Sequence, residues 1–183
     1  MEVIKTDIPD VVIIEPRVFL DERGYFYESF NQKEFEEKVG KKINFVQDNQ
    51  SKSSYGVVRG LHFQLPPHAQ TKLVRCVKGK IVDFAVDLRK DSTTYGKYVA
   101  VELSEENHRQ LFIPKGFAHG FSTQSEEAIV QYKCDDFYCK ECEGGIYILD
   151  EELNIPLNIS GEDIILSDKD TKWKPLKELN SSF

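Results

Sequence analysis

The feature that most constrains the fold of this chain is a succession of short apolar and β-branched segments, separated by turn-forming residues at intervals of about ten residues. Strand-like segments occur at 11–14, 25–29, 44–49, 80–89, 97–103, 109–114, 119–124, 128–134 and 144–149. Such spacing is typical of an antiparallel β-sandwich or barrel, because a parallel sheet needs a long crossover between strands. The sequence therefore predicts an all-β fold in a single domain, residues 1–183.

One short helix is expected between the first strands and the rest. Asn31 is a good N-cap residue, Glu34 follows it at capping-box spacing, and Gly40 ends the run. After residue 150 the strand pattern weakens, and the end of the chain is expected to be a loop with a short terminal helix that folds back on the barrel.

The run GVVRGLHFQLPPHAQTKLVR, residues 56–75, concentrates the cations and imidazoles Arg59, His62, His68, Lys72 and Arg75. It reads as two strands joined at Pro66-Pro67, a hairpin or something close to one. Strict alternation would place Arg59 and His62 on opposite faces. Because glycine within a strand often marks a bulge, Gly60 suggests an irregularity that lets them converge. The alternative is a hydrogen-bonded core histidine beside solvated cations.

The segment at 80–89 has two different faces. Val82, Phe84, Val86 and Leu88 share one face, and Ile81, Asp83, Ala85 and Asp87 share the other. We expect the first face to belong to the core. The acids of the second face either meet solvent or line a polar cavity in which Asp83 pairs with a cation.

The net charge of −7 argues against a nucleic-acid surface, which needs a basic footprint. Arg59, Lys72 and Arg75 nevertheless concentrate positive charge locally, as a site for a small anion would. We see no apolar run long enough for a membrane span and no apolar signal core in MEVIKTDIPD, so we expect a cytoplasmic protein without a membrane partner.

The sequence has four cysteines, Cys76, Cys134, Cys139 and Cys142, which do not form a disulfide scaffold in a chain of this length. Cys139 and Cys142 form a CxxC, a pattern that raises zinc or redox chemistry. A second ligand pair at similar spacing is missing, so we interpret the CxxC as chance spacing in a polar loop. His62 and His119 are isolated and do not form the HxH of metal-binding cupins, and we assign no metal and no role for His68.

The stretches DERGYFYESF, FVQDNQSKS, VVRGLHFQ, QTKLVRC, GKIVDFAVDLRKDSTTYGK and IPKGFAHGF resemble, in this order, the dTDP-4-dehydrorhamnose 3,5-epimerase family of cupin-like sugar-nucleotide epimerases. The resemblance runs from about residue 3 to about residue 175. It implies a cupin-type antiparallel β-sandwich or jelly-roll barrel with a few short peripheral helices, usually a homodimer. It also implies a dTDP-linked 4-keto-6-deoxyhexose as substrate and no cofactor.

The resemblance also implies residue roles. His62 matches the general base, Tyr132 the acid on the opposite sugar face, Asp170 the carboxylate that orients His62, and Lys72 the group that stabilises the enolate. Positions that match binding residues for the nucleotide sugar are Arg23, Glu28, Gln47, Asp48, Asn49, Arg59, His119, Glu143 and Lys169, and Tyr138 matches the aromatic that stacks on thymine. NIPLNISGEDIIL departs from the family pattern, which leaves the path to Lys169 and Asp170 open.

These residue types suit inversion of the carbons next to a ketone. A neutral imidazole with a pKa near 6.5 can remove a proton at neutral pH, and a tyrosine with a pKa near 10 can return one. The implied reaction converts dTDP-4-dehydro-6-deoxy-D-glucose to dTDP-4-dehydro-L-rhamnose by inversion at C3 and C5, in dTDP-L-rhamnose biosynthesis. The alternatives are epimerisation at C3 or C5 alone, a metal-dependent cupin, or a sugar-nucleotide-binding module without catalysis.

Overall fold

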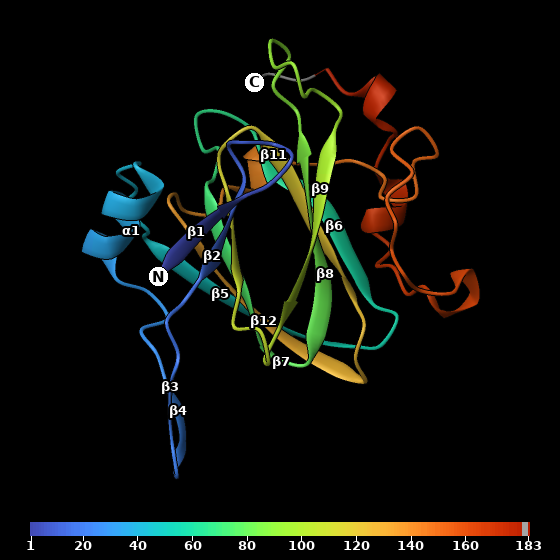
Figure 1. Ribbon diagram of the computed structural model, residues 1–183. Coiled ribbons are helices and arrows are strands. Elements are labelled where there is room, and N and C mark those ends of the chain that lie inside the picture. Colours follow the sequence, from blue (N-terminus) through green and yellow to red (C-terminus); the bar gives the residue numbers. More distant parts are fainter. Residues whose placement is uncertain (181–182) are drawn as a thin grey trace.

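The computed structural model describes residues 1–180 and 183, which form two antiparallel sheets that face each other (Figure 1). One sheet has the order β1 (Glu2–Lys5), β2 (Val12–Glu15), β10 (Gln110–Ile113), β7 (Lys72–Lys78), β12 (Glu127–Cys134) and β5 (Gln47–Ser54). The other has the order β13 (Glu143–Gly145), β6 (Val58–Gln64), β11 (Phe117–Thr123), β8 (Lys80–Asp87) and β9 (Tyr98–Ser104). The predicted all-β, cupin-like sandwich is confirmed.

Smaller elements surround the sandwich. They are the hairpin of β3 (Phe19–Asp21) and β4 (Gly24–Phe26), the helix α1 (Gln32–Val39), and the single 3-10 turns η1 (Lys140–Cys142), η2 (Gly161–Asp163), η3 (Asp170–Lys172) and η4 (Leu176–Glu178). In Figure 1 the β3–β4 hairpin projects away from the body of the molecule. Among residues 1–180 and 183, no helix has both the length and the apolar character needed to cross a membrane.

The helix α1 is confirmed with the predicted caps. Asn31 Oδ1 accepts a hydrogen bond from the Glu34 backbone N–H at 3.1 Å, and Gly40 ends the helix with φ 72°. Phe35 is buried against Phe112 of β10, with ring centroids 5.5 Å apart. The helix therefore covers the outer face of the β1-to-β5 sheet, at its edge.

The prediction that residues 56–75 form a hairpin is wrong. The strands β6 and β7 lie in different sheets, where β6 pairs with β11 and β13 while β7 pairs with β10 and β12. The connection through Pro66-Pro67 therefore carries the chain from one sheet to the other. This crossing places residues of both strands around the same interior space.

The predicted irregularity at Gly60 is confirmed. His62 pairs with His119 and Arg59 with Phe121, so β6 holds one more residue than β11 between these two pairs. Gly60 has φ 111°, and a Cβ added there would lie 2.6 Å from Gly120 Cα. The close approach of the two backbones requires glycine, and the bulge turns both Arg59 and His62 toward one cavity.

Both faces of β8 are buried, so the first face belongs to a core as expected, and of the two alternatives for the second face solvent exposure is wrong. Ile81 and Ala85 belong to the core between the sheets. The opposite face, which carries Phe84, is covered by apolar residues of the C-terminal part, among them Ile148 and Leu157. The chain after residue 150 thus folds back on the barrel as expected, but as single 3-10 turns and not as a terminal helix.

Candidate active site

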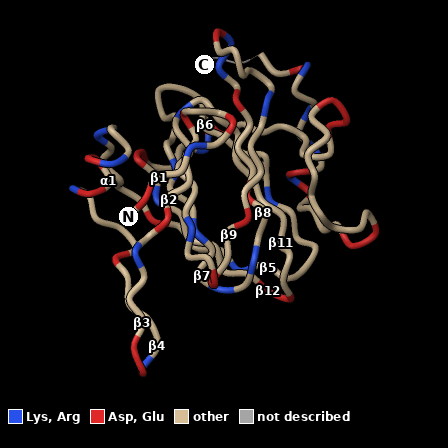
Figure 2. Tube along the Cα trace, in the orientation of Figure 1, with Lys and Arg blue, Asp and Glu red and all other residues tan. Residues whose placement is uncertain are grey.

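A cavity of about 530 Å³ is lined by side chains from both sheets, a size that suits a small-molecule ligand. The predicted site residues on its wall are Arg59, His62, Lys72, His119, Tyr132, Tyr138, Glu143, Lys169 and Asp170. They come from β6, β7, β11, β12 and the segment after β12. Figure 2 shows lysine and arginine positions interspersed with aspartate and glutamate along the chain. The cavity lining combines the cations Arg59, Lys72 and Lys169 with the acids Glu143 and Asp170.

His62 and Asp170 form a close pair although 108 residues separate them, with His62 Nε2 and Asp170 Oδ1 2.5 Å apart. Asp170 begins the turn η3 and is buried, while His62 is partly exposed. Burial would raise the pKa of Asp170, but hydrogen bonds from His62, Ser167 and the Gly60 backbone outweigh it and lower that pKa. The carboxylate stays ionised and accepts the Nε2–H, which leaves Nδ1 as the basic nitrogen of His62.

A second buried histidine faces a second carboxylate. His119 Nε2 lies 2.7 Å from Asp83 Oδ1, and both side chains are almost without solvent contact. Burial lowers the pKa of His119 and raises the pKa of Asp83. The Asp83 carboxylate is thus paired with a cation-forming group, as one of the two sequence alternatives supposed, and Lys72 contributes a further positive charge to it.

Lys72 and Tyr132 lie next to each other on the cavity wall. The Lys72 ammonium is 5.8 Å from the centre of the Tyr132 ring. Burial lowers the pKa of Lys72, while the negative charges of Asp83 and Glu143 act against this shift. Burial raises the pKa of Tyr132, so its phenol is protonated at neutral pH and can act as an acid.

The outer part of the cavity carries groups suited to a charged, aromatic ligand. Arg59 is held by hydrogen bonds from Nε to Ser53 Oγ and from Nη2 to the Lys52 carbonyl, at 3.0 and 3.1 Å. Lys169 is ion-paired with Glu143, and Tyr138 Oη donates to Glu143 Oε2 at 3.2 Å. Because Tyr138 is 56% exposed, it is accessible for stacking.

Several predicted residues do not line this cavity. Gln47 lies outside the lining and accepts a hydrogen bond from the Tyr138 backbone N–H at 3.1 Å. Asp48 is paired with Lys133, and both Asp48 and Asn49 line a separate depression. Arg75 also lies there, on the other face of β7 from Lys72, so it is not part of the predicted cation cluster at the cavity.

Arg23 and Glu28 lie still farther from the cavity lining. Arg23 is at the tip of the β3–β4 hairpin, 85% exposed and paired with Asp21. Glu28 lines a different depression beside α1 and accepts a hydrogen bond from Asn31 Nδ2 at 3.2 Å. Within one chain, these two residues are not brought together with His62.

Two residues that shape the site escaped the sequence reasoning. Trp173 packs edge-on against His62, with ring centroids 6.5 Å apart, and fits against Gly145, where a Cβ would meet it at 2.4 Å. The signal was available, because Trp173 is the single tryptophan of the chain. Gln64 is buried and bonds to the Cys139 backbone N–H and the His68 carbonyl, both at 2.7 Å, so it joins two loops at the cavity edge.

Neither cavity histidine belongs to a group of potential metal ligands among the described residues. Their Nε2 atoms both face carboxylates, Asp170 and Asp83. The group that does occur, His68 with Cys139 and Cys142, is not part of the cavity lining. The cavity is therefore suited to proton transfer by side chains, because the imidazole of His62 and the phenol of Tyr132 line the same space.

Comparison with known proteins agrees with this chemistry. The family model described as dTDP-4-dehydrorhamnose 3,5-epimerase matches residues 5–178. The chain is 61% identical to a Shigella flexneri protein of that name over 170 residues, 93% of each chain. The crystal structure of dTDP-4-dehydrorhamnose 3,5-epimerase from Elizabethkingia anophelis superimposes with a TM-score of 0.94 at 54% identity, covering 99% of each chain.

A further solved structure carries a sugar nucleotide. The dTDP-6-deoxy-D-glucose-3,5-epimerase of Legionella pneumophila, in complex with dTDP-4-keto-L-rhamnose, has a TM-score of 0.94 and 48% identity, and the match covers 98% of this chain and 94% of that one. Fold, cavity residues and sequence similarity over nearly the whole length agree. The chain belongs to the dTDP-4-dehydrorhamnose 3,5-epimerase family.

Proposed function

We propose that this protein is a dTDP-4-dehydrorhamnose 3,5-epimerase. It inverts C3 and C5 of dTDP-4-dehydro-6-deoxy-D-glucose and releases dTDP-4-dehydro-L-rhamnose, a step of dTDP-L-rhamnose biosynthesis. The observation that carries the proposal is the His62–Asp170 pair on the wall of one cavity with Tyr132 and Lys72. The names of similar proteins supply the substrate.

The proposed reaction begins with proton removal by His62. A hydrogen on C3 or C5 is acidic because the neighbouring C4 ketone takes up the electron pair of the broken C–H bond as an enolate. The Nδ1 of His62 accepts this proton, and Asp170 stabilises the imidazolium that forms. The Lys72 ammonium stabilises the enolate oxygen, by analogy with hydrogen-bond donors of oxyanion holes.

Inversion follows when the proton returns from the other side. Tyr132 donates its phenol proton to the opposite face of the enolate carbon, and the carbonyl re-forms. The protein must then restore the two protonation states, which exchange with solvent accomplishes. Because the carbon is neither oxidised nor reduced overall, the reaction needs no redox cofactor.

The nucleotide end of the substrate is assigned to the outer cavity. Arg59 and Lys169 are placed to meet the diphosphate, for which the arginine fork is well matched. Tyr138 stacks on the thymine, held by Gln47 and Glu143. His119, neutral in its buried position beside Asp83, positions the sugar. We expect the reaction in the cytoplasm, since the four cysteines are free.

The protein is further proposed to act as a homodimer in which Arg23 and Glu28 serve the cavity of the partner copy. The β3–β4 hairpin exposes large apolar side chains, with Leu20 81% and Phe26 66% exposed, as an uncovered interface would. Arg23 at its tip matches a substrate-binding position but is remote from the cavity lining of its own chain. A second copy that receives the hairpin reconciles both facts. Asp48 and Asn49 retain their proposed binding role, in the separate depression that they line.

The deciding experiment is incubation with the 4-keto sugar nucleotide in heavy water without added metal, followed by NMR of the sugar. We expect deuterium at both C3 and C5. Label at one carbon alone would replace the proposal with single-site epimerisation, and label at neither would leave a binding module. An activity that is lost to a chelator and restored by a metal ion, also in a variant without Cys139 and Cys142, would support a metal-dependent cupin instead.

Two variants test the assigned roles. His62→Ala and Tyr132→Phe are each expected to lower turnover by at least about a hundredfold while binding of thymidine diphosphate stays nearly unchanged. Thermal stabilisation by thymidine diphosphate, larger than that by uridine diphosphate, is the matched binding measurement. Near-normal turnover in His62→Ala would remove this histidine as the base.

A further inference from the structure

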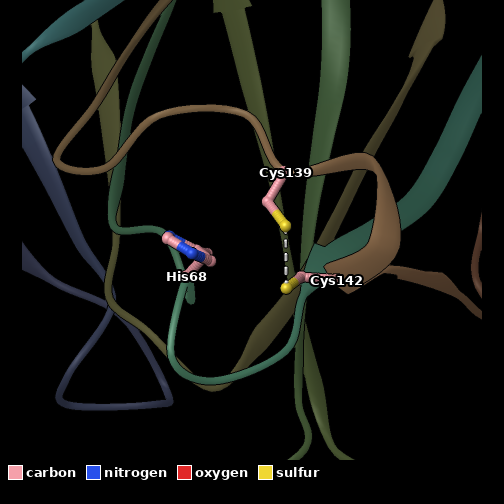
Figure 3. A group of neighbouring side chains, drawn as sticks. All are labelled: His68, Cys139 and Cys142. Atoms are coloured by element: carbon pink, nitrogen blue, oxygen red, sulfur yellow. Dashed lines mark hydrogen bonds between the residues drawn. The ribbon is translucent and has the colours of Figure 1, made fainter.

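Outside the cavity, the fold brings together two cysteines and a histidine that are far apart in the sequence. Cys139 and Cys142 flank the turn η1, and His68 lies in the connection from β6 to β7. One ring nitrogen of His68 and the two sulfurs all lie within 4.8 Å of one another. Figure 3 shows the three side chains meeting between the two loops. The CxxC, which has no ligand pair near it in sequence, thus acquires a third ligand through the fold.

Two further carboxylates border this group. Glu141 Oε2 lies 3.6 Å from Cys139 Sγ but outside the group of atoms within 4.8 Å of one another, so it completes a set of four ligands only after a side-chain shift. Asp136 Oδ2 lies 3.4 Å from His68 Nδ1, a buried atom that has no hydrogen-bond partner. Metal-ligating histidines commonly have a carboxylate beside the ring, which fixes its orientation.

The geometry is close to that of a tetrahedral ion site. Both thiols are free and their sulfurs are 2.9 Å apart. Zinc–sulfur bonds of about 2.3 Å hold two thiolates about 3.7 Å apart, so side-chain shifts of about 1 Å suffice. A disulfide between the same cysteines would use only the two sulfurs, whereas a thiophilic cation uses the imidazole as well.

We propose that His68, Cys139 and Cys142 bind one Zn²⁺ per chain, with Glu141 as the fourth ligand. Binding forms two zinc–thiolate bonds and releases the two thiol protons to solvent. The ion is structural, because its ligands are not part of the cavity lining and the proposed proton transfers do not use it.

The ion would clamp the edge of the cavity where the nucleotide is expected. Tyr138 and Glu143 directly flank the Cys139–Cys142 segment. Gln64 already bonds to both loops, through the Cys139 N–H and the His68 carbonyl. Zinc would add a side-chain link between the same loops, so that the Tyr138 ring is held in place when substrate arrives.

The test uses the full-length protein, reduced and freed of metal by a chelator. We expect it to bind one Zn²⁺ per chain with a Kd below about 1 μM, measured by competition with a chromophoric chelator. Co²⁺ in place of Zn²⁺ should give a thiolate-to-cobalt charge-transfer band and the intense visible bands of tetrahedral coordination. Excess Zn²⁺ at about 100-fold its Kd should raise the Tm by about 5–10 °C.

Variants assign the ligands. The double variant Cys139→Ser/Cys142→Ser should lose the charge-transfer band and the Tm increase, while His68→Gln and Glu141→Gln should each weaken binding by about tenfold or more. Cys76→Ala is the matched control, because Cys76 is a buried thiol outside the group and its loss should leave the Kd unchanged. Circular dichroism confirms that each variant is folded.

The proposal is overturned by either of two results. The first is a reduced wild-type protein that binds Zn²⁺ no more tightly than the double variant does. The second is a protein isolated with a Cys139–Cys142 disulfide that takes up no Co²⁺ after reduction, which would make the pair a redox device. Unchanged affinity in Glu141→Gln would overturn the assignment of the fourth ligand.

Discussion

At the residue scale, the two cavity histidines differ because the carboxylates behind them differ. Asp170 accepts hydrogen bonds from Ser167 and Gly60 in addition to His62, and its pKa is lowered despite burial. Asp83 has one oxygen without a hydrogen-bond partner, and burial raises its pKa. An ionised Asp170 can stabilise a newly formed imidazolium, whereas the Asp83 pair favours a neutral, fixed His119. This difference supports His62, and not His119, as the base.

The first prediction concerns the pair of His62 and Asp170. Asp170→Asn keeps the size of the side chain but removes the charge that stabilises protonated His62. We expect kcat to fall by between about a hundredfold and about ten-thousandfold, with a much smaller change in KM, because no group that contacts the substrate is lost. Steady-state kinetics measure both. Asp168→Asn, at an exposed position two residues earlier, should behave as the unchanged protein does.

If Asp170→Asn retained turnover within about threefold, the carboxylate would not assist proton removal and the role of His62 would need revision.

At the scale of elements, the bulge in β6 decides where the His62 side chain points. The extra residue of β6 between the pairs His62–His119 and Arg59–Phe121 shifts the pairing register of β6 and β11 by one residue. Without it, strict alternation would send Arg59 and His62 to opposite faces of the sheet. The local backbone thus determines which side chains share the cavity.

The second prediction tests this bulge. Gly60→Ala places a Cβ 2.6 Å from Gly120 Cα and 2.7 Å from the His119 carbonyl, in a left-handed conformation that alanine disfavours. We expect the free energy of unfolding to fall by about 1–3 kcal/mol and kcat to fall with it, since His62 shifts. Urea unfolding and kinetics measure the two effects. Gly161→Ala, which meets nothing within 4 Å, is the control, and equal behaviour of the two variants would contradict the requirement for glycine at residue 60.

The third prediction concerns the connection from β8 to β9, which is anchored on Asp87. This buried carboxylate accepts hydrogen bonds from Arg89 at 2.7 and 2.8 Å and from Ser92 and Thr94 at 2.6 Å. Burial opposes ionisation, but these bonds lower the pKa of Asp87 to about 2. Because the folded pKa lies below the unfolded one, the stabilisation is complete above about pH 4 and is lost as pH falls toward 2.

Asp87→Asn should therefore lower the free energy of unfolding by about 2 kcal/mol at pH 7, and the difference from the unchanged protein should narrow below about pH 4. Urea unfolding at a series of pH values measures it. Asp91→Asn, an exposed position on the same connection, should show no such difference. If the difference in unfolding free energy for Asp87→Asn stays constant down to pH 2.5, the lost hydrogen bonds of the side chain, and not its charge, are responsible.

The elements also show which features a sequence can predict. The ends of α1 were predictable because capping is local: Asn31 and Gly40 act within one turn of the helix. The strand β1 was missed because it has only four residues, too few for a clear pattern. The strand β5 begins at Gln47, later than the apolar pattern at 44–49 indicates, because this edge strand is polar throughout and lacks the apolar signal. Sheet partners depend on where the chain crosses, so β6 and β7 were wrongly paired.

At the scale of the whole molecule, the site is completed by parts that are distant in sequence. Asp170 reaches His62 because residues after 146 cover the outer face of the sheet that contains β6 and β8. Alternation in β8 predicted two distinct faces but carried no information on which segment would cover the apolar one. The proposed role of Asp170 was therefore accessible only through the family resemblance, and the grouping of His68 with the CxxC was accessible only through the fold.

The fourth prediction addresses the proposed homodimer. If Arg23 on the β3–β4 hairpin serves the cavity of the partner copy, each site combines His62 from one chain with Arg23 from the other. Arg23→Ala should then lower kcat/KM by about 10- to 100-fold, because a charge-assisted contact to the substrate is lost. His62→Ala should be inactive by itself.

A mixture of the two variants, unfolded and refolded together at equal amounts, distinguishes a site made by two chains from one made by a single chain. In a random mixture of a symmetric dimer, half of the molecules are heterodimers, and one of their two sites has both His62 and Arg23 intact, so activity should return to about a quarter of the unmutated level. Refolding each variant alone gives the baseline. If the mixture has only the average activity of the two variants, Arg23 acts on its own chain's cavity or on none, and the exposed hairpin must be explained in another way.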